Sequence, residues 1–283
     1  MFASPKCLSS LILLLPLAYC VEPAAQTYPT TVEVDLVFPR NETYAPAQLM
    51  PMIFALQNPQ AAVRLHLNIA WTLGRVEGDQ GAGDSANYTR LLQDSDNFSQ
   101  ANLSTNDPYF IIRYTEKLNN TEGHFWLAWG ADNDNCSRAA NGDVGRGWDS
   151  SYNITYFTTK NGAQQPSLVT RPDTCPLAQG FTYNVTGTMK LSPASRGVCP
   201  ITANPPPPAT PCALNISDSQ ASIIMANITA DACFWAQSSF PTLAICSSDA
   251  NRTVRVAAGV REGEWDKVAL SLLIGTILGA FLL

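Results

Sequence analysis

The stretch FTYNVTGTMKL at residues 181–191 alternates apolar and polar side chains over most of its length. Phe181, Tyr183 and Val185 fall on one face of an extended chain, and threonine and asparagine side chains fall on the other. Successive side chains of a β-strand point to opposite faces, so this pattern predicts a strand with one buried and one solvent-facing side. Half-buried strands of this kind are typical of antiparallel sheets.

Similar alternation predicts further half-buried strands at residues 31–38, 63–72 and 152–156. The side chains that we expect to face the core in the last two segments are Val63, Leu65, Leu67, Ile69, Trp71, Tyr152, Ile154 and Tyr156. Residues 50–56 and 110–114 alternate less, so we expect them to be buried more deeply. Turn-forming residues separate these segments. The sequence therefore predicts an all-β fold, an antiparallel β-sandwich.

One segment in the C-terminal part favours a helix. Residues 217–220, SDSQ, fit a capping box, and Ala221, Ile224 and Ile228 follow at helical spacing. The β-branched residues leave a strand as the alternative. We therefore expect one short helix there. Four consecutive prolines within residues 204–211 indicate an exposed polyproline connector just before it.

The N-terminus is typical of a secreted protein. Lys6 precedes an apolar run from Leu8 to Ala18, and Val21 follows a cleavage site with Ala18 and Cys20 at its −3 and −1 positions. The apolar run is shorter than the roughly 20 residues of a membrane span. We interpret residues 1–20 as a signal peptide.

The C-terminus carries a second targeting signal. The last sixteen residues, 268–283, contain no charge, and a polar spacer at residues 260–267 precedes them. Small residues, a polar spacer and an apolar tail together form a glycosylphosphatidylinositol signal. We predict attachment at Ala257, which leaves a single β-rich extracellular domain at residues 21–257 on the outer leaflet of the plasma membrane and removes residues 258–283. A single-pass membrane anchor is the alternative.

N-glycosylation sequons are unusually frequent, with eleven in 283 residues. They lie at Asn41, Asn87, Asn97, Asn102, Asn119, Asn135, Asn153, Asn184, Asn215, Asn227 and Asn251. We expect Asn135 to be used least, because Cys136 occupies its middle position. Charged residues make up only 14% of the chain, and glycans would hydrate faces that lack charge. The net charge of −6 without a basic patch argues against nucleic acid as a partner.

The middle residues of seven sequons are apolar: Tyr88, Phe98, Leu103, Ile154, Val185, Ile216 and Ile228. On a strand, the Asn and the Ser or Thr of a sequon point to one side and the middle residue points to the other. We therefore expect these apolar residues to face inward beneath glycans on exposed strand faces.

Six cysteines remain in the chain that follows the signal peptide, and an even number in a secreted chain predicts a disulfide framework. They are Cys136, Cys175, Cys199, Cys212, Cys233 and Cys246. Fifteen pairings are open to six cysteines, and the local Cys233–Cys246 bridge is the one that we favour. The cysteine-rich part begins at about residue 136.

The start of the secreted chain resembles a known family. Residues 28–44, YPTTVEVDLVFPRNETY, continue to IFALQNP at residues 53–59. This sequence is similar to a family of uncharacterised secreted proteins of filamentous fungi that share a domain of unknown function. The likeness covers residues 27–246. It implies a fungal source and often a lipid-anchored tail, but it brings no activity and no catalytic residues.

No catalytic, cofactor or metal signature stands out, and the chain has only two histidines. A glycoside hydrolase needs two carboxylates. No pattern selects a pair among the available acidic residues, which are Glu33, Asp35, Glu77, Asp79, Glu116 and Glu122. The run Phe125–Trp129 instead offers Trp126 or Trp129 as candidate platforms for a sugar ring, with core packing as the alternative. We therefore expect a non-enzymatic structural or interaction protein of the fungal cell wall. A carbohydrate-binding module for wall polysaccharide and a wall-modifying hydrolase are the alternatives.

Overall fold

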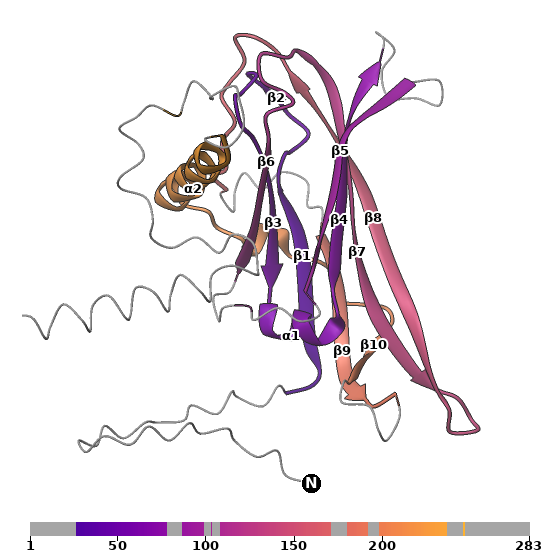
Figure 1. Ribbon diagram of the computed structural model, residues 1–283. Helices are drawn as coiled ribbons and strands as arrows, with labels where there is room; N and C mark the ends of the chain where they lie inside the picture. Colours follow the sequence, from indigo (N-terminus) through magenta and orange to yellow (C-terminus); the bar gives the residue numbers. More distant parts are fainter. Residues whose placement is uncertain are drawn as a thin grey trace, which may run out of the picture.

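The computed structural model describes residues 27–77, 87–98, 103, 108–170, 180–191, 198–236 and 246. Two five-stranded β-sheets face each other across one core, with a long helix beside one of them (Figure 1). The structure confirms the predicted all-β sandwich with a C-terminal helix.

Sheet A has the strand order β10-β9-β1-β3-β6, and all of its pairings are antiparallel. Its strands are β10 (Cys199–Ala203), β9 (Gly180–Met189), β1 (Thr30–Phe38), β3 (Met50–Gln57) and β6 (Tyr109–Thr115). Val34 of β1 pairs with Phe181 of β9 on one side and with Leu56 of β3 on the other. This row places apolar residues from three strands on the inner face.

Sheet B has the order β2-β8-β7-β4-β5. Its strands are β2 (Thr43–Tyr44), β8 (Val144–Thr159), β7 (Gly123–Arg138), β4 (Asn68–Glu77) and β5 (Asn87–Asn97). The long β7–β8 hairpin is antiparallel, and only the short β2 pairs in parallel with β8. Two long strands therefore run the length of the molecule at the centre and edge of this sheet (Figure 1).

Large aromatic side chains connect the two sheets in the core. The ring of Phe54 from β3 lies 5.5 Å from the rings of both Trp71 and Trp129, which come from β4 and β7. Trp129 also lies 4.6 Å from Phe181 of β9. Each buried aromatic removes about 150–250 Å² from water, so this cluster is a large part of the force that holds the sheets together.

The helix α2 (Asp218–Ala236) begins at the predicted capping box. The backbone N–H of Gln220 donates to Oγ of Ser217 at 3.3 Å, and the N–H of Ser217 donates to Oε1 of Gln220 at 3.0 Å. These reciprocal bonds satisfy two donors at the helix start. Ile224 and Ile228 are buried as predicted, and the Tyr114 hydroxyl of β6 donates to Asp231 at 2.9 Å. The helix therefore packs on the outer side of sheet A.

Residues 59–65 form the helix α1 (Pro59–Leu65) and not the first part of a strand. Pro59 at the helix start and Ala61, Ala62 and Leu65 on its buried side satisfy helical spacing. His66 adopts a left-handed conformation that ends the helix, so the strand predicted at residues 63–72 is wrong over its first part. A short 3-10 turn, η2 (Pro211–Ala213), follows the four consecutive prolines within residues 204–211.

Two further burial predictions need revision. Tyr152 and Ile154 are 80% and 39% exposed, so the predicted inward face of this segment is its outward face. Residues 110–114 lie on β6, which is an edge strand of sheet A, and only Ile111 among them is fully buried. By contrast, the predicted deep burial of residues 50–56 is confirmed at every apolar position.

Two disulfides are present among the described residues. Cys233 and Cys246 form the predicted local bridge, and Cys136 of β7 joins Cys199 of β10 across the sandwich. The second bridge closes a sequence separation of 63 residues, and a loop of that length predicts a stabilisation of about 4 kcal/mol. Within the described ranges, no helix is both long enough and apolar enough to cross a membrane.

Candidate functional site

The two sheets differ in what covers their outer faces. Helix α2 and the proline-rich segment cover sheet A, where the hydroxyl of Thr182 donates to the carbonyl of Pro207 and the backbone N–H of Thr210 donates to Glu33. The outward side chains of sheet B are mostly half-buried or exposed. The outer face of sheet B is therefore the more accessible of the two.

Cross-strand rows describe this face, each running from β5 through β4 and β7 to β8. Four rows are Arg90–Gly74–Trp126–Tyr156, Gln93–Thr72–Ala128–Ile154, Ser95–Ala70–Gly130–Tyr152 and Asn97–Asn68–Asp132–Ser150. The β5 side of the face is polar, the β8 side carries Tyr152 and Tyr156, and the two middle rows carry small uncharged residues on β4 and β7. We call these four rows the outer face of sheet B.

Three aromatic side chains gather at one end of the face. The rings of Tyr88 and Trp126 meet edge to face with centroids 5.9 Å apart. A hydrogen bond with the Tyr88 hydroxyl, together with partial burial, raises the pKa of Tyr156. We call this group, Tyr88, Trp126 and Tyr156, the near station. It joins strand β5 to strand β8 across the width of the sheet.

Gly74 allows the indole of Trp126 to lie flat across β4. A Cβ atom at this position would clash with the six-membered ring and the nitrogen of that indole. Gly130 has a similar role beside Tyr152, because a Cβ there would lie 2.7 Å from the carbonyl oxygen of Ser151 and 3.3 Å from Cβ of Tyr152. The two glycines therefore leave the sheet surface low beside the aromatic rings. We call this surface of β4 and β7 the floor of the face.

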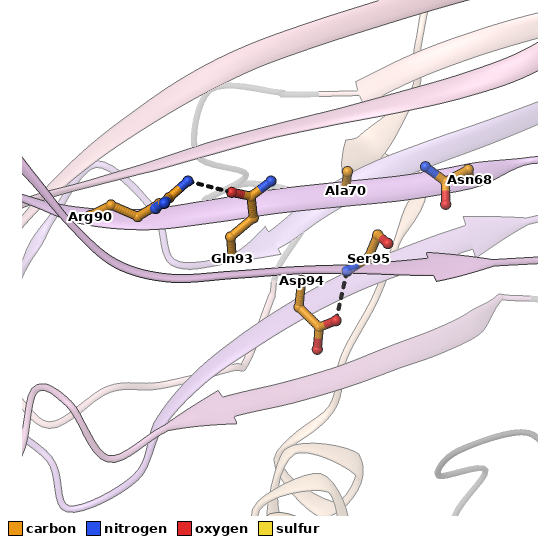
Figure 2. A pocket seen from close by; sticks show the side chains of 6 residues that line it. All are labelled: Asn68, Ala70, Arg90, Gln93, Asp94 and Ser95. Atoms are coloured by element: carbon orange, nitrogen blue, oxygen red, sulfur yellow. Dashed lines mark hydrogen bonds between the residues drawn. The ribbon is translucent and has the colours of Figure 1, made fainter.

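A shallow pocket of about 560 Å³ lies over the β4 and β5 side of the face (Figure 2). Its lining is Asn68, Ala70, Arg90, Gln93, Asp94 and Ser95. The Arg90 guanidinium donates to Oε1 of Gln93 at 2.8 Å, and the backbone N–H of Ser95 donates to the Asp94 carboxylate at 2.9 Å. Amide, hydroxyl and guanidinium groups therefore border the floor on the side opposite the aromatic residues.

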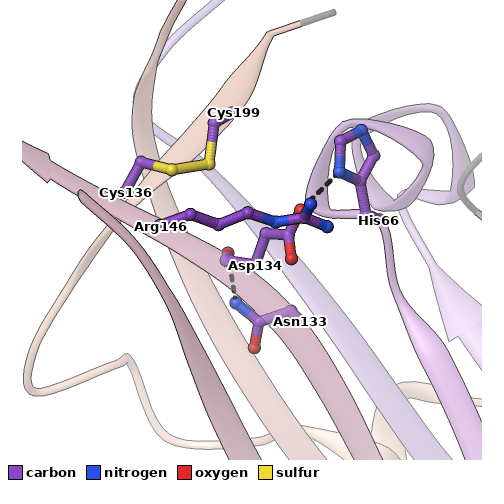
Figure 3. Close-up of polar contacts among 6 residues, drawn as sticks. All are labelled: His66, Asn133, Asp134, Cys136, Arg146 and Cys199. Atoms are coloured by element: carbon purple, nitrogen blue, oxygen red, sulfur yellow. Dashed lines mark hydrogen bonds and ion pairs between the residues drawn. A yellow bond between two sulfur atoms is a disulfide. The ribbon is translucent and has the colours of Figure 1, made fainter. Parts of the chain in front are cut away.

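A second aromatic platform stands at the other end of β8. Trp148 is 67% exposed, and its ring lies 5.3 Å from the guanidinium carbon of Arg146. The Asp134 carboxylate, only 1% exposed, holds this arginine at 2.8 Å and His66 at 2.5 Å (Figure 3). The Cys136–Cys199 bridge lies beside this cluster. We call Trp148 with Arg146 the far station.

The structure separates the two predicted sugar platforms. Trp129 faces the core and is 2% exposed, so its ring cannot stack on a sugar. Trp126 faces the opposite way, because successive side chains alternate along β7, and it lies half-buried in the near station. Tyr88, Trp148 and Tyr152 were missed as platforms because no sequence pattern places them on the same side as Trp126. Their pairing in register with β4 and β7 supplies that reason.

Four sequon asparagines lie on strands of sheet B: Asn87, Asn97, Asn135 and Asn153. Asn97 is exposed at the corner of the outer face, whereas Asn184 lies on sheet A and Asn41 and Asn215 lie in exposed loops. Asn119 and Asn227 are half-buried outside sheet B, and Asn153 points to the side of β8 opposite Ile154. Asn135 accepts a hydrogen bond from the backbone N–H of Thr202 at 3.2 Å. Use of these sequons stays a prediction.

Several predicted positions lie outside the described residues or outside the described side chains. They are Asn102, Cys175, Asn251, Ala257, both terminal signals and the side chains of Asn87 and Cys212. Five of the seven apolar middle residues are buried as predicted: Phe98, Leu103, Val185, Ile216 and Ile228. The two exceptions, Tyr88 and Ile154, are exposed on the outer face of sheet B.

Glu33 and Asp35 form a carboxyl pair, but on the other sheet. Both point to the outer side of β1, are 6% and 0% exposed, and lie beneath the proline-rich segment, where Thr210 bonds Glu33. Burial and the neighbouring Glu33 raise the pKa of Asp35 to about 8. In this arrangement the pair cannot reach a polymer in solvent. Within the described ranges, no three His, Cys, Asp or Glu residues are grouped to hold a metal ion.

The fold and this face define a two-sheet β-sandwich protein that presents aromatic side chains from one outer surface. The chain belongs to the DUF7136 family, a domain of unknown function whose model matches residues 27–242. This confirms the resemblance to a family of unknown function. No curated protein and no solved structure matches the chain.

Proposed function

We propose that this protein binds neutral cell-wall polysaccharide through the outer face of sheet B. The observation that carries the proposal is the set of exposed aromatic side chains along one sheet face, beside small residues and a polar border. The proposal assigns no catalytic step, since the buried carboxyl pair lies on the opposite sheet.

The chemistry of the face matches that of a sugar chain. A pyranose ring presents C–H groups above and below its plane and hydroxyl groups around its rim. Aromatic rings offer flat apolar surface for the C–H groups, and the side chains of Gln93, Ser95 and Asn68 offer hydrogen bonds for the hydroxyls. The two middle rows carry no charge, which favours a neutral ligand over an ionic one.

The middle of the outer face of sheet B suits a slender ligand. Sequon asparagines lie on β5, β7 and β8 as well as on sheet A, but none of them is among the outward residues of the two middle rows. A protein–protein interface of stable size would favour a contiguous apolar centre. Here the centre consists of Thr72, Ala128, Ala70 and Gly130, which suits a slender polymer better.

The cellular location forms part of the proposal. We infer that the chain is a secreted fungal glycoprotein that a glycosylphosphatidylinositol anchor holds at the cell surface. The support is the signal peptide at residues 1–20, the small-residue, spacer and tail pattern around Ala257, and the eleven sequons. Such a location would bring the outer face of sheet B into contact with wall polymers.

Co-sedimentation with insoluble chitin and β-glucan particles tests the binding proposal. We expect the secreted domain, residues 21–257, to be retained on at least one of the two polymers. Tyr152→Ala and Trp126→Ala should each reduce retention severalfold, because each removes one apolar platform. Phe234→Ala is the matched control, since Phe234 is 61% exposed but lies on α2.

Two results would contradict the proposal. One is the absence of retention on either polymer, and the other is retention that Phe234→Ala reduces as much as Tyr152→Ala. The location has its own test, in which a phosphatidylinositol-specific phospholipase releases the protein from cells and removal of N-glycans increases its gel mobility. A protein that responds to neither enzyme would contradict the inferred address.

A further inference from the structure

We propose that the ligand is a linear polysaccharide that lies lengthwise along β8 and contacts the near and far stations together. This inference rests on the proposed function and adds the shape of the ligand and its direction on the sheet. It separates a long unbranched chain from a single terminal sugar or a branched glycan.

The two stations lie far apart along β8. Tyr156 belongs to the near station and Trp148 to the far station, and both lie on β8 with Tyr152 between them. Eight residues of strand at about 3.3 Å each place the stations about 26 Å apart. This length is several times the width of one sugar ring, so no single sugar can contact both.

Small residues line the sheet surface between the two stations. Ala128 and Gly130 of β7 lie beside Ile154 and Tyr152 of β8. A larger side chain in either position would rise into the path between the stations, and Gly130 has no room for even a Cβ atom. These small residues are followed toward the far station by Ser150, whose hydroxyl donates to Asp132 at 2.6 Å, and together they leave a path parallel to β8. The pocket over β4 and β5 is shallow and lies beside this path, not across it.

Polar contacts hold the side chains of the far station in place. An exposed tryptophan on a long hairpin would lose side-chain freedom on binding. Here the guanidinium of Arg146 lies against the ring, and the buried Asp134 fixes that guanidinium by an ion pair at 2.8 Å (Figure 3). His66 holds the same carboxylate from the end of α1. The far station is thus held in place before a ligand arrives, which lowers the cost of binding.

Titration calorimetry with soluble oligosaccharides of increasing length tests this inference. The probes are linear β-glucan and chitin oligomers, from the disaccharide up to chains longer than the distance between the stations. We expect the affinity to rise with length until both stations are spanned. Trp148→Ala should weaken the binding of long oligomers about three- to tenfold and leave short oligomers unaffected. Trp126→Ala should weaken both.

Arg146→Lys tests the positioning role of the far station. Lysine keeps the charge but lacks the planar group that lies against an aromatic ring. We expect this variant to lower the ratio of long-chain to short-chain affinity in the same direction as Trp148→Ala. An unchanged circular dichroism spectrum and melting temperature would show that the fold is intact, as the exposure of both side chains predicts.

The outcomes distinguish this inference from the proposed function. Equal affinity for short and long chains, or an equal loss for both in Trp148→Ala, would overturn the lengthwise chain and leave polysaccharide binding in place. Binding of branched N-glycans without binding of linear oligomers would overturn it as well. Failure of every oligomer and both insoluble polymers to bind would remove the proposed function itself.

Discussion

Gly74 is a residue whose lack of a side chain shapes the whole near station. The Trp126 indole lies directly over it, in the space that a Cβ atom would occupy. The glycine also lies in the middle of a strand, where it costs roughly 0.5–1 kcal/mol relative to alanine. The proposed binding face gives this glycine a role in addition to folding, namely to make room for the Trp126 ring.

We predict that Gly74→Ala separates binding from stability. The new Cβ displaces the Trp126 ring, so retention on the polysaccharide should fall severalfold while the fold persists. Gly187→Ala is the control, because a Cβ there meets only Cδ1 of Ile201 at an ordinary 3.7 Å on sheet A. Co-sedimentation with a parallel urea titration measures both effects. Full retention by Gly74→Ala would show that the Trp126 position has no part in binding.

Asp35 shows how a buried carboxyl makes stability depend on pH. Its pKa is raised by burial, and further by Glu33, from 3.8 to about 8, while Nε2 of Gln57 donates to it at 2.9 Å. The folded chain therefore keeps a proton that the unfolded chain releases above pH 3.8. Stability from this group is fully present below about pH 4 and is lost as the pH rises through about 8.

Asp35→Asn should remove this pH dependence, because an amide has nearly the shape of the protonated acid and does not ionise. We expect the variant to exceed the natural chain in stability at pH 8 by about 1–3 kcal/mol, and by less at pH 5. Urea unfolding at both pH values measures the difference. Glu116→Gln, an exposed carboxyl, serves as the control. A difference that stays constant from pH 5 to pH 8 would contradict the buried titration.

Among the elements, β8 shows what alternation along one strand can and cannot predict. Tyr152, Ile154 and Tyr156 alternate with polar residues, which correctly indicates a strand but does not say which side faces the core. The neighbouring β7 decides the side, since Phe125, Leu127 and Trp129 form a stronger apolar row that must face inward. Its register then turns the aromatic row of β8 outward. Cross-strand pairing, which the sequence alone did not predict, was the missing information.

Helix α1 shows that a period-two pattern of apolar residues does not by itself exclude a helix. The burial of Leu65, Leu67, Ile69 and Trp71 was predicted correctly, but a helix that ends at Leu65 and a strand that begins at Asn68 satisfy it together. Period-two spacing over three apolar residues cannot exclude a helical turn. Pro59 and the two alanines that follow it were the local signal for the helix. The capping box of α2, by contrast, is a four-residue pattern with its own hydrogen bonds and was predicted in full.

The disulfide framework depends on the fold as well as on the spacing of the cysteines. Cys136–Cys199 joins two strands whose proximity depends on the fold, so the spacing of the cysteines could not reveal it. With the two observed bridges assigned, we predict that Cys175 pairs with Cys212. Thr170 bonds the carbonyl of Leu214 and the backbone N–H of Ile216, so the chain that leads to Cys175 starts close to the chain that follows Cys212.

Peptide mapping of the unreduced secreted protein by mass spectrometry checks this pairing. We expect one linked peptide pair for each of the three bridges, with Cys175 and Cys212 in the third. A free thiol at both positions, or a bridge from either of them to one of the other four cysteines, would contradict the assignment. Removal of the Cys136–Cys199 bridge by a double alanine variant should cost about 4 kcal/mol.

At the scale of the whole molecule, the two outer faces differ in what covers them. Sheet A is covered by α2 and the proline-rich segment, and it carries the Asn184 sequon. Sheet B presents aromatic side chains, and its sequon asparagines, Asn87, Asn97, Asn135 and Asn153, lie outside the two middle rows of outward residues. Tyr88 and Ile154 are the two apolar middle residues of sequons that do not face inward as predicted. Both lie on the outer side of sheet B. The sequence rule failed where binding is proposed, as is expected when function overrides the packing pattern.

This division allows a glycan to be used as a local blocker. Ala70 lies in the centre of the outer face of sheet B, and Ala70→Asn creates a sequon with Thr72 two positions later. A glycan there would rise from β4 beside the path between the two stations and is large enough to cover it, so the secreted variant should lose most of its retention on polysaccharide. The variant that combines Ala70→Asn with Thr72→Ala keeps the asparagine but has no sequon. It should bind nearly as well as the natural chain, and enzymatic removal of the glycan should restore binding to the single variant. If a confirmed glycan at this position leaves retention unchanged, the polymer does not bind this face of the molecule.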